Sequence, residues 1–180
     1  MARLIMWNLM TLDGFVEGES RDISWHSDVW GEELERLSID QLKSAGGLMF
    51  GRVTYELMAN HFPGAEGEVA DLMNALPKYV FSRTLTTSGW NNTRILGTDV
   101  ADTVARLKRD SAKDIYLFGS ADLAASLIPH RLIDEFRIGL NPLLLGAGSP
   151  LFRTGGKVGL KLLDSRPLSN GIVILRYEPS

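Results

Sequence analysis

Short, almost uninterrupted apolar runs recur along the chain and constrain its fold more than any other feature. Strands that appear in a sequence as continuous apolar runs are typical of parallel sheets covered on both faces. Helical patterns separate several of these runs, for example at residues 32–44 and 100–107. This alternation predicts an α/β fold in which helices connect parallel strands. The predicted strands are residues 4–10, 48–50, 78–82, 94–96 and 114–118.

The pattern changes after Ile133. Two apolar segments, around residues 160–163 and 172–177, flank the turn sequence Ser169-Asn170-Gly171, which favours a hairpin. The C-terminal strands are therefore expected to form an antiparallel edge on a mostly parallel sheet. Because an apolar sheet edge can pair with a second copy of the chain, a homodimer is also expected.

Composition limits the classes of function. A length of 180 residues predicts a single domain, residues 1–180, and the net charge of -3 gives no indication of a nucleic-acid or membrane partner. The absence of cysteine excludes disulfides, thiolate metal sites and a cysteine nucleophile. The N-terminal apolar run is too short for a signal peptide or membrane span, so a cytoplasmic protein is expected. No metal site is expected, because the histidines do not cluster in sequence: His26, His61 and His130.

Three strand ends carry residues suited to binding phosphate. Gly51-Arg52-x-Thr54 and Gly119-Ser120 each lie between a predicted strand and a helix, and Ser82-Arg83 follows another strand. Helix N-termini and guanidinium groups both favour anions, and ligands of α/β proteins bind at the carboxyl ends of parallel strands. For any one of these sites, a turn glycine, a capping serine or a solvated arginine remains the alternative. Together they predict a single phosphate-bearing small molecule.

Asp28 is the candidate acid. We expect it at the start of a helix near Trp25 and Trp30, where partial burial would raise its pKa. A helix-capping role is an equally open interpretation. Phe50 and Tyr55, on composition alone, are typical of a core rather than of a pocket.

The order of five motifs resembles the dihydrofolate reductase superfamily. The closing segment, residues 141–152 (NPLLLGAGSPLF), resembles the branch that contains the reductase domain of bifunctional riboflavin-biosynthesis proteins. The resemblance spans nearly the whole chain. The motifs are residues 11–15 (TLDGF), 51–56 (GRVTYE), 80–85 (VFSRTL), 115–120 (IYLFGS) and 132–135 (LIDE).

This resemblance implies a mixed, mostly parallel sheet of about eight strands flanked by helices, with NADPH bound in extended form across the strand ends. It implies that Ser82 and Arg83 hold the adenosine 2′-phosphate, and that Asp28 donates a proton. The other implied contacts with the cofactor fall in three groups: Gly51, Arg52 and Thr54 at phosphates, Gly119, Ser120 and Ala121 at the pyrophosphate, and Leu12, Gly14 and Phe15 over the nicotinamide. Candidate substrate contacts are Trp25, Phe50 and Tyr55.

Two departures from the family pattern affect function. Asp28 follows Trp25 at a shorter offset than the helix acid of dihydrofolate reductases, and the chain has no cysteine for the zinc deaminase that usually accompanies riboflavin-type reductases. The prediction is therefore a stand-alone NADPH-dependent reductase that transfers a hydride to a C=N or C=O group of a pterin- or pyrimidine-like substrate. The offset of Asp28 keeps a second hypothesis open, a non-catalytic nucleotide-binding or regulatory protein on the same fold.

Overall fold

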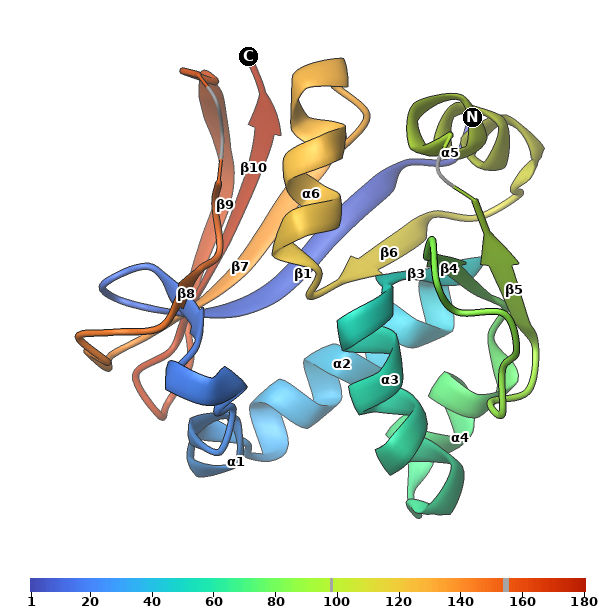
Figure 1. Ribbon diagram of the computed structural model, residues 1–180. Coiled ribbons are helices and arrows are strands. Elements are labelled where there is room, and N and C mark those ends of the chain that lie inside the picture. Colours follow the sequence, from blue (N-terminus) through green and yellow to red (C-terminus); the bar gives the residue numbers. More distant parts are fainter. Residues whose placement is uncertain (98, 154–155) are drawn as a thin grey trace.

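A mixed sheet of eight strands forms the centre of the molecule, as Figure 1 shows. The computed structural model describes residues 1–97, 99–153 and 156–180. The strand order is β5-β4-β3-β6-β1-β7-β10-β9. Each pair of neighbouring strands from β5 to β7 is parallel, whereas β10 pairs antiparallel with both β7 and β9. The predicted fold class is thus confirmed. The strands are β1 (Leu4–Thr11), β3 (Gly47–Gly51), β4 (Lys78–Phe81), β5 (Thr93–Leu96), β6 (Ile115–Phe118), β7 (Glu135–Asn141), β9 (Leu160–Pro167) and β10 (Val173–Pro179).

Helices cover both faces of this sheet (Figure 1). Successive side chains of a strand point to opposite faces. In β1, Ile5 packs into the cluster under α2 and α4, whereas Leu4 and Met6 pack into the cluster under α5 and α6. This burial on both faces explains the unbroken apolar runs. The helices are α1 (Trp25–Val29), α2 (Glu32–Ser44), α3 (Arg52–His61), α4 (Glu68–Ala75), α5 (Val100–Asp110) and α6 (Ala121–Leu127), with short 3-10 turns η1 (Glu19–Arg21), η2 (Phe62–Gly64) and η3 (Ile128–His130). No helix in these residue ranges is long and apolar enough to cross a membrane.

The segment between β1 and α2 is anchored to the loop after β7. Its strand β2 (Phe15–Glu17) pairs with β8 (Ser149–Pro150). In the turn before β2, the Asp13 carboxylate accepts hydrogen bonds from Thr11 Oγ1 at 2.6 Å and from the backbone N–H of Gly146 at 2.8 Å. These bonds hold the pKa of Asp13 below its usual value. The long connection after β1 is therefore held beside the carboxyl ends of the strands.

Candidate functional site

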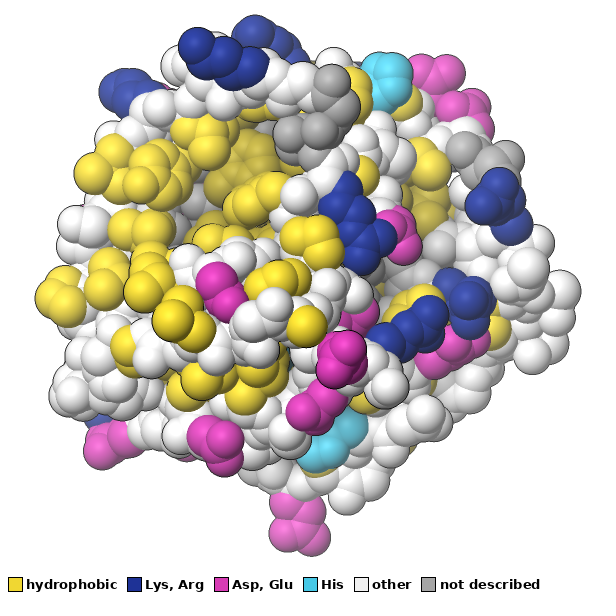
Figure 2. All heavy atoms as spheres, turned by 60° about the vertical axis from the view of Figure 1, so that its left-hand side comes forward, with side chains coloured by type: hydrophobic (Ala, Val, Ile, Leu, Met, Phe, Trp, Pro, Cys, Tyr) yellow, Lys and Arg dark blue, Asp and Glu magenta, His cyan; other side chains and the backbone are white. Residues whose placement is uncertain are grey.

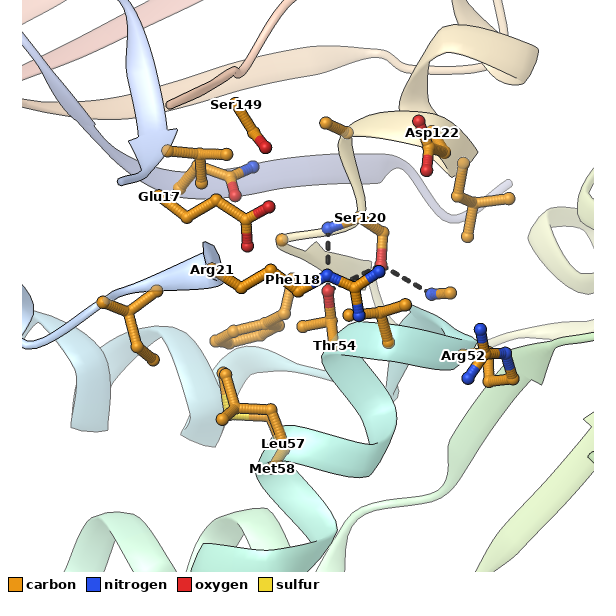
Figure 3. A pocket seen from close by; sticks show the side chains of 18 of the residues that line it. Glu17, Arg21, Arg52, Thr54, Leu57, Met58, Phe118, Ser120, Asp122 and Ser149 are labelled. Atoms are coloured by element: carbon orange, nitrogen blue, oxygen red, sulfur yellow. Dashed lines mark hydrogen bonds between the residues drawn. The ribbon is translucent and has the colours of Figure 1, made fainter. Parts of the chain in front are cut away.

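One large cavity of about 1260 Å³ lies at the carboxyl ends of the parallel strands. The ends of β3, β4 and β6 border it, together with the starts of α3 and α6. Figure 3 shows side chains from these elements and from the segment after β1, with Glu17 and Arg21 pointing into the cavity. Open α/β sheets bind ligands at this edge.

The ends of β3 and β6 are joined by a small hydrogen-bond network, drawn in Figure 3. Ser120 Oγ accepts the backbone N–H of Gly51 at 2.6 Å, and Thr54 Oγ1 accepts the Ser120 N–H at 3.0 Å and the Ser120 hydroxyl at 3.2 Å. Gly119 has a φ of 55°, and a Cβ there would lie 2.8 Å from the Thr54 side chain. Glycine is therefore required for this close approach. Because Thr54 Oγ1 accepts both bonds, its own hydrogen can be donated to a ligand.

Two arginines border the same cavity. Arg52 begins α3 and forms an exposed ion pair with Glu56 at 2.8 Å. Such a pair, four residues apart on a helix, contributes only about 0.3–0.5 kcal/mol, so Arg52 can turn toward a bound anion at small cost. Arg83 is exposed just after β4, where Ser82 Oγ accepts the N–H of Leu85 at 2.8 Å and shapes the turn.

The structure brings the three predicted strand ends together on this cavity, as the sequence analysis expected. All of their named residues line it: Gly51, Arg52, Thr54, Ser82, Arg83, Gly119, Ser120 and Ala121. In the described part of the chain, no group of three or more His, Cys, Asp and Glu side chains could hold a metal ion.

The predicted substrate contacts are not on this cavity. Trp25, Phe50 and Tyr55 have exposed fractions of 4%, 0% and 3% and belong to the core cluster. Their assignment as substrate contacts was wrong, and the core interpretation of Phe50 and Tyr55 is confirmed. The reason is that Phe50 lies inside β3 and Tyr55 faces inward from α3, where its ring packs against Phe50.

The loop predicted to cover the nicotinamide does not line the cavity, but the residues that follow it do. Leu12, Gly14 and Phe15 are not among the residues that line the cavity, and Leu12 is 61% exposed. The segment immediately after them, residues 16–21, lines the cavity instead. The pairing of β2 with β8 explains this shift, because it fixes the turn at Gly14 away from the cavity and brings the following residues over it.

Asp28 does not occupy the position expected of a buried acid. It is the fourth of five residues in α1, it is exposed, and it does not line the cavity. The expected place near a helix start is confirmed, because Asp28 lies in the first turn of α1, whereas the expected partial burial was wrong. Trp25, in the same helix, is buried in the core, whereas Asp28 is exposed. From the same segment, His26 lines the cavity, and its ring nitrogen Nε2 lies 3.3 Å from the Val16 carbonyl oxygen; burial lowers the pKa of His26.

Sequence reasoning missed the part of the cavity wall formed by β1 and α2. Asn8 and Gln41 are 4% and 3% exposed, and their side-chain nitrogens, Nδ2 and Nε2, are buried without a hydrogen-bond partner in the described structure. Polar residues inside an apolar strand and on the inner face of a helix were the available signal. The wall residues from these two elements are Trp7, Asn8, Leu9, Ser38, Gln41 and Leu42.

Comparison with known proteins places these features in context. Residues 2–174 match the model of the RibD C-terminal domain family. Over 182 residues the chain is 32% identical to the uncharacterized protein YyaP of Bacillus subtilis (strain 168), and the match covers 98% of this chain and 94% of that protein.

The fold is shared with solved structures of other proteins. The chain is similar to a pyrimidine reductase-like protein from Corynebacterium diphtheriae, with a TM-score of 0.74 and 14% identity over 99% of this chain and 92% of the other. It is also similar to the dihydrofolate reductase from Enterococcus faecalis complexed with NADP(H) and RAB-propyl, with a TM-score of 0.69 and 11% identity over 99% of this chain and 96% of the other. At these identities the likeness shows the fold alone.

Proposed function

The chain belongs to the RibD C-terminal domain family, and from this premise we propose that it is an NADPH-dependent oxidoreductase. Its reaction is the transfer of a hydride to a C=N or C=O group of a pterin-like or ribosylaminopyrimidine-like substrate. Two proteins of the same fold support this class: one is described as pyrimidine reductase-like, and the other is a reductase complexed with NADP(H). The observation that carries the proposal is that the three strand ends predicted to bind anions meet on one cavity.

The residues present fit a cofactor with several phosphates. The Thr54 hydroxyl and the start of α3 offer donors to one phosphate group, with Arg52 beside them once it leaves Glu56. The absence of a Cβ at Gly119 keeps the backbone between β6 and α6 close to Thr54, so that donors from both strand ends reach the same part of the cavity. Ser82 and Arg83 follow β4, which lies beside β3 in the sheet. They would hold the 2′-phosphate.

NADPH, when bound, supplies the hydride. The protein's contribution is to hold the cofactor and the acceptor side by side and to exclude water. The apolar side chains of Trp7, Leu9, Met58 and Phe118 suit the second task, because they line the cavity. Asp28 lies off the cavity, so no side chain is assigned as proton donor.

The experiment that tests this function is a direct assay of the purified chain. NADPH binding is measured by fluorescence titration, and NADPH oxidation is followed at 340 nm with a panel of pterins and ribosylaminopyrimidines. Binding together with oxidation by at least one substrate is the expected result. Binding without oxidation across the panel would favour the nucleotide-binding alternative, which the position of Asp28 keeps open. No binding of NADPH would refute both.

We also propose that two copies pair through the C-terminal edge of the sheet. β9 is the outermost strand beside β10, and all of its residues are exposed. Leu160, Leu162 and Leu163 of this strand are 42%, 50% and 41% exposed. Figure 2, which brings the left-hand side of Figure 1 forward, shows hydrophobic side chains gathered over this side of the molecule. A large exposed apolar surface of this kind marks an interaction site.

A further inference from the structure

The turn between β9 and β10 contains Asn170-Gly171, the only Asn-Gly step in the sequence. The Gly171 N–H donates to the Leu168 carbonyl at 3.1 Å, which closes the turn, and Gly171 has a φ of 88°. Glycine is required here, because residues with a Cβ disfavour this φ and a Cβ would lie 3.2 Å from Pro142. The hairpin therefore fixes the glycine that follows Asn170, and Asn170 itself is exposed.

An Asn-Gly step can convert its own side chain into a carboxylate. The glycine nitrogen loses its proton to solvent base and attacks the asparagine Cγ. The Cγ–Nδ2 bond breaks, and Nδ2 takes up a proton and leaves as ammonia, which gives a cyclic imide. Water then opens the imide to aspartate or isoaspartate, so one water is consumed and one ammonia is released. As in other intramolecular reactions, the rate depends on how freely the two reacting atoms can meet.

Three hydrogen bonds in the folded chain oppose this attack. Leu168 holds the Gly171 N–H, so the attacking nitrogen keeps its proton. The Asn170 Oδ1 accepts the Ile172 N–H at 3.2 Å, and Asn170 Nδ2 donates to the Val29 carbonyl at 2.8 Å. The side-chain amide is thus held on Ile172 and Val29. The turn must leave this arrangement before Cγ and the Gly171 nitrogen can react.

The turn is bound to the α1–α2 corner, residues 26–33, which lies beside it in Figure 1. Val29 is the last residue of α1, and Glu33 lies in the first turn of α2. The Glu33 carboxylate accepts the Ser169 N–H at 2.7 Å and also the Ser169 hydroxyl. These bonds lower the pKa of Glu33, so its carboxylate is ionised at neutral pH. The same corner carries His26 and Trp30, which line the cavity.

Deamidation would weaken this attachment in two ways. It replaces the Nδ2 donor with a carboxylate oxygen, which cannot donate to the Val29 carbonyl. It also adds a negative charge next to Ser169, whose partner is the ionised Glu33. A lost hydrogen bond and a repulsion between like charges both disfavour the docked turn.

We propose that Asn170 is a site of spontaneous deamidation, that docking of its turn on the α1–α2 corner restrains the reaction, and that the product releases this corner. The modification acts on one wall of the cavity from a residue that does not line it. It is irreversible, because the released ammonia is lost to solvent.

The test incubates the full chain in mildly alkaline buffer and follows the amide-to-carboxylate conversion at each asparagine by peptide mass mapping. In the urea-unfolded chain, Asn170 should react before every other asparagine. In the folded chain it should react at least about tenfold more slowly, because the three bonds that hold the turn must first be broken. This comparison needs no variant.

A matched pair of variants isolates the docking. Glu33→Ala removes both bonds to Ser169 and should speed the reaction of Asn170 in the folded chain at least about fivefold. Glu35→Ala removes a glutamate from the same turn of α2, at an exposed position with no hydrogen bond to the hairpin turn in the described structure. It should leave the rate within about twofold. Melting curves show that each variant is folded during the incubation.

Asn170→Asp reproduces the product and tests the release of the corner. Amide hydrogen exchange in residues 26–33 should become at least about threefold faster than in the wild type. Asn91→Asp, which adds the same charge at an exposed position that does not line the cavity, should leave exchange there unchanged. Unchanged exchange in Asn170→Asp would overturn the proposed release.

Three other results would overturn the restrained site. They are earlier reaction of another asparagine in the unfolded chain, equal rates at Asn170 in the folded and unfolded wild type, and equal rates in Glu33→Ala and the wild type. None of these measurements involves NADPH. A chain that lacks reductase activity would therefore refute the proposed function and leave this inference intact.

Discussion

The Ser120 hydroxyl accepts the backbone N–H of Gly51 at 2.6 Å, which ties the ends of two neighbouring strands into one unit. Thr54 completes the link by accepting two bonds from Ser120. Gly119, with its φ of 55°, allows this approach. The proposed cofactor site is therefore preorganised in the protein before any ligand binds, which lowers the entropic cost of binding.

Substitution at Gly119 tests this preorganisation. Gly119→Ala is expected to lower the free energy of unfolding by about 2 kcal/mol, because alanine disfavours a positive φ and its Cβ would contact Thr54 at 2.8 Å. NADPH affinity should fall as well. Gly89→Ala is the control, since a Cβ there has no atom within 4 Å, and should change stability by less than about 0.5 kcal/mol. Urea denaturation measures both, and equal stability of the two variants would contradict the model of a preorganised link.

The proposed role of Arg83 predicts a cofactor preference. Arg83→Ala should weaken NADPH binding at least about tenfold, because a guanidinium–phosphate contact is lost, and should change NADH binding by less than about twofold. Fluorescence titration with both cofactors measures the ratio. Arg109→Ala, on an exposed position of α5 away from the cavity, is the matched control. An equal loss of affinity for NADPH and NADH would refute the 2′-phosphate assignment.

Lys78 predicts a pH dependence of stability. It is 0% exposed, its Nζ donates to the carbonyls of Asn74 and Leu76 at 2.8 and 2.9 Å, and burial lowers its pKa from 10.5 to about 8. The unfolded chain thus binds more protons than the folded chain between these values, so Lys78 makes stability rise with pH from about 8 to 10.5. Relative to Lys78→Met, the wild type should gain stability over this range, at up to about 1.4 kcal/mol per pH unit.

Urea denaturation of the two proteins at pH 7, 8, 9 and 10 measures that difference. Groups common to both proteins cancel in the comparison. A constant difference across the series would show that Lys78 does not titrate in this range.

The proposed pairing through β9 predicts a concentration-dependent mass. Light scattering after size exclusion should give twice the chain mass of 19.9 kDa for the wild type and the single-chain mass for Leu162→Lys, because a lysine at the contact buries an unpaired charge. Leu144→Lys, at a residue that is 68% exposed outside β9, should remain dimeric. A wild-type protein that stays monomeric at all concentrations would refute the proposed pairing through β9.

The fold was accessible from the sequence because its signals are local. An apolar run between two breaks is visible without knowledge of the rest of the chain, and the strand ends at Gly51, Ser82 and Gly119 follow directly from such runs. Parallel topology then places these ends at one edge. The cavity that they share was therefore predictable, although no single motif defined it.

The inner wall of the cavity was not accessible in the same way. Gln41 and Arg137 lie 96 residues apart, and only the folded sheet and α2 bring them together. In a helix as short as α1, periodicity does not show which side chains are buried, so the burial of Trp25 in the core and the exposure of Asp28 were not predicted. Phe50 and Tyr55 show the same difficulty, since an aromatic beside a binding motif can serve the core rather than the ligand.

Amide hydrogen exchange with and without NADP⁺ tests the central claim most directly. If one extended cofactor contacts all three strand ends, exchange should slow together in residues 51–54, 82–85 and 119–122, while β9 on the far edge of the sheet remains unchanged. Protection that appears at none of these segments, or at only one of them, would contradict a single cofactor held across the strand ends.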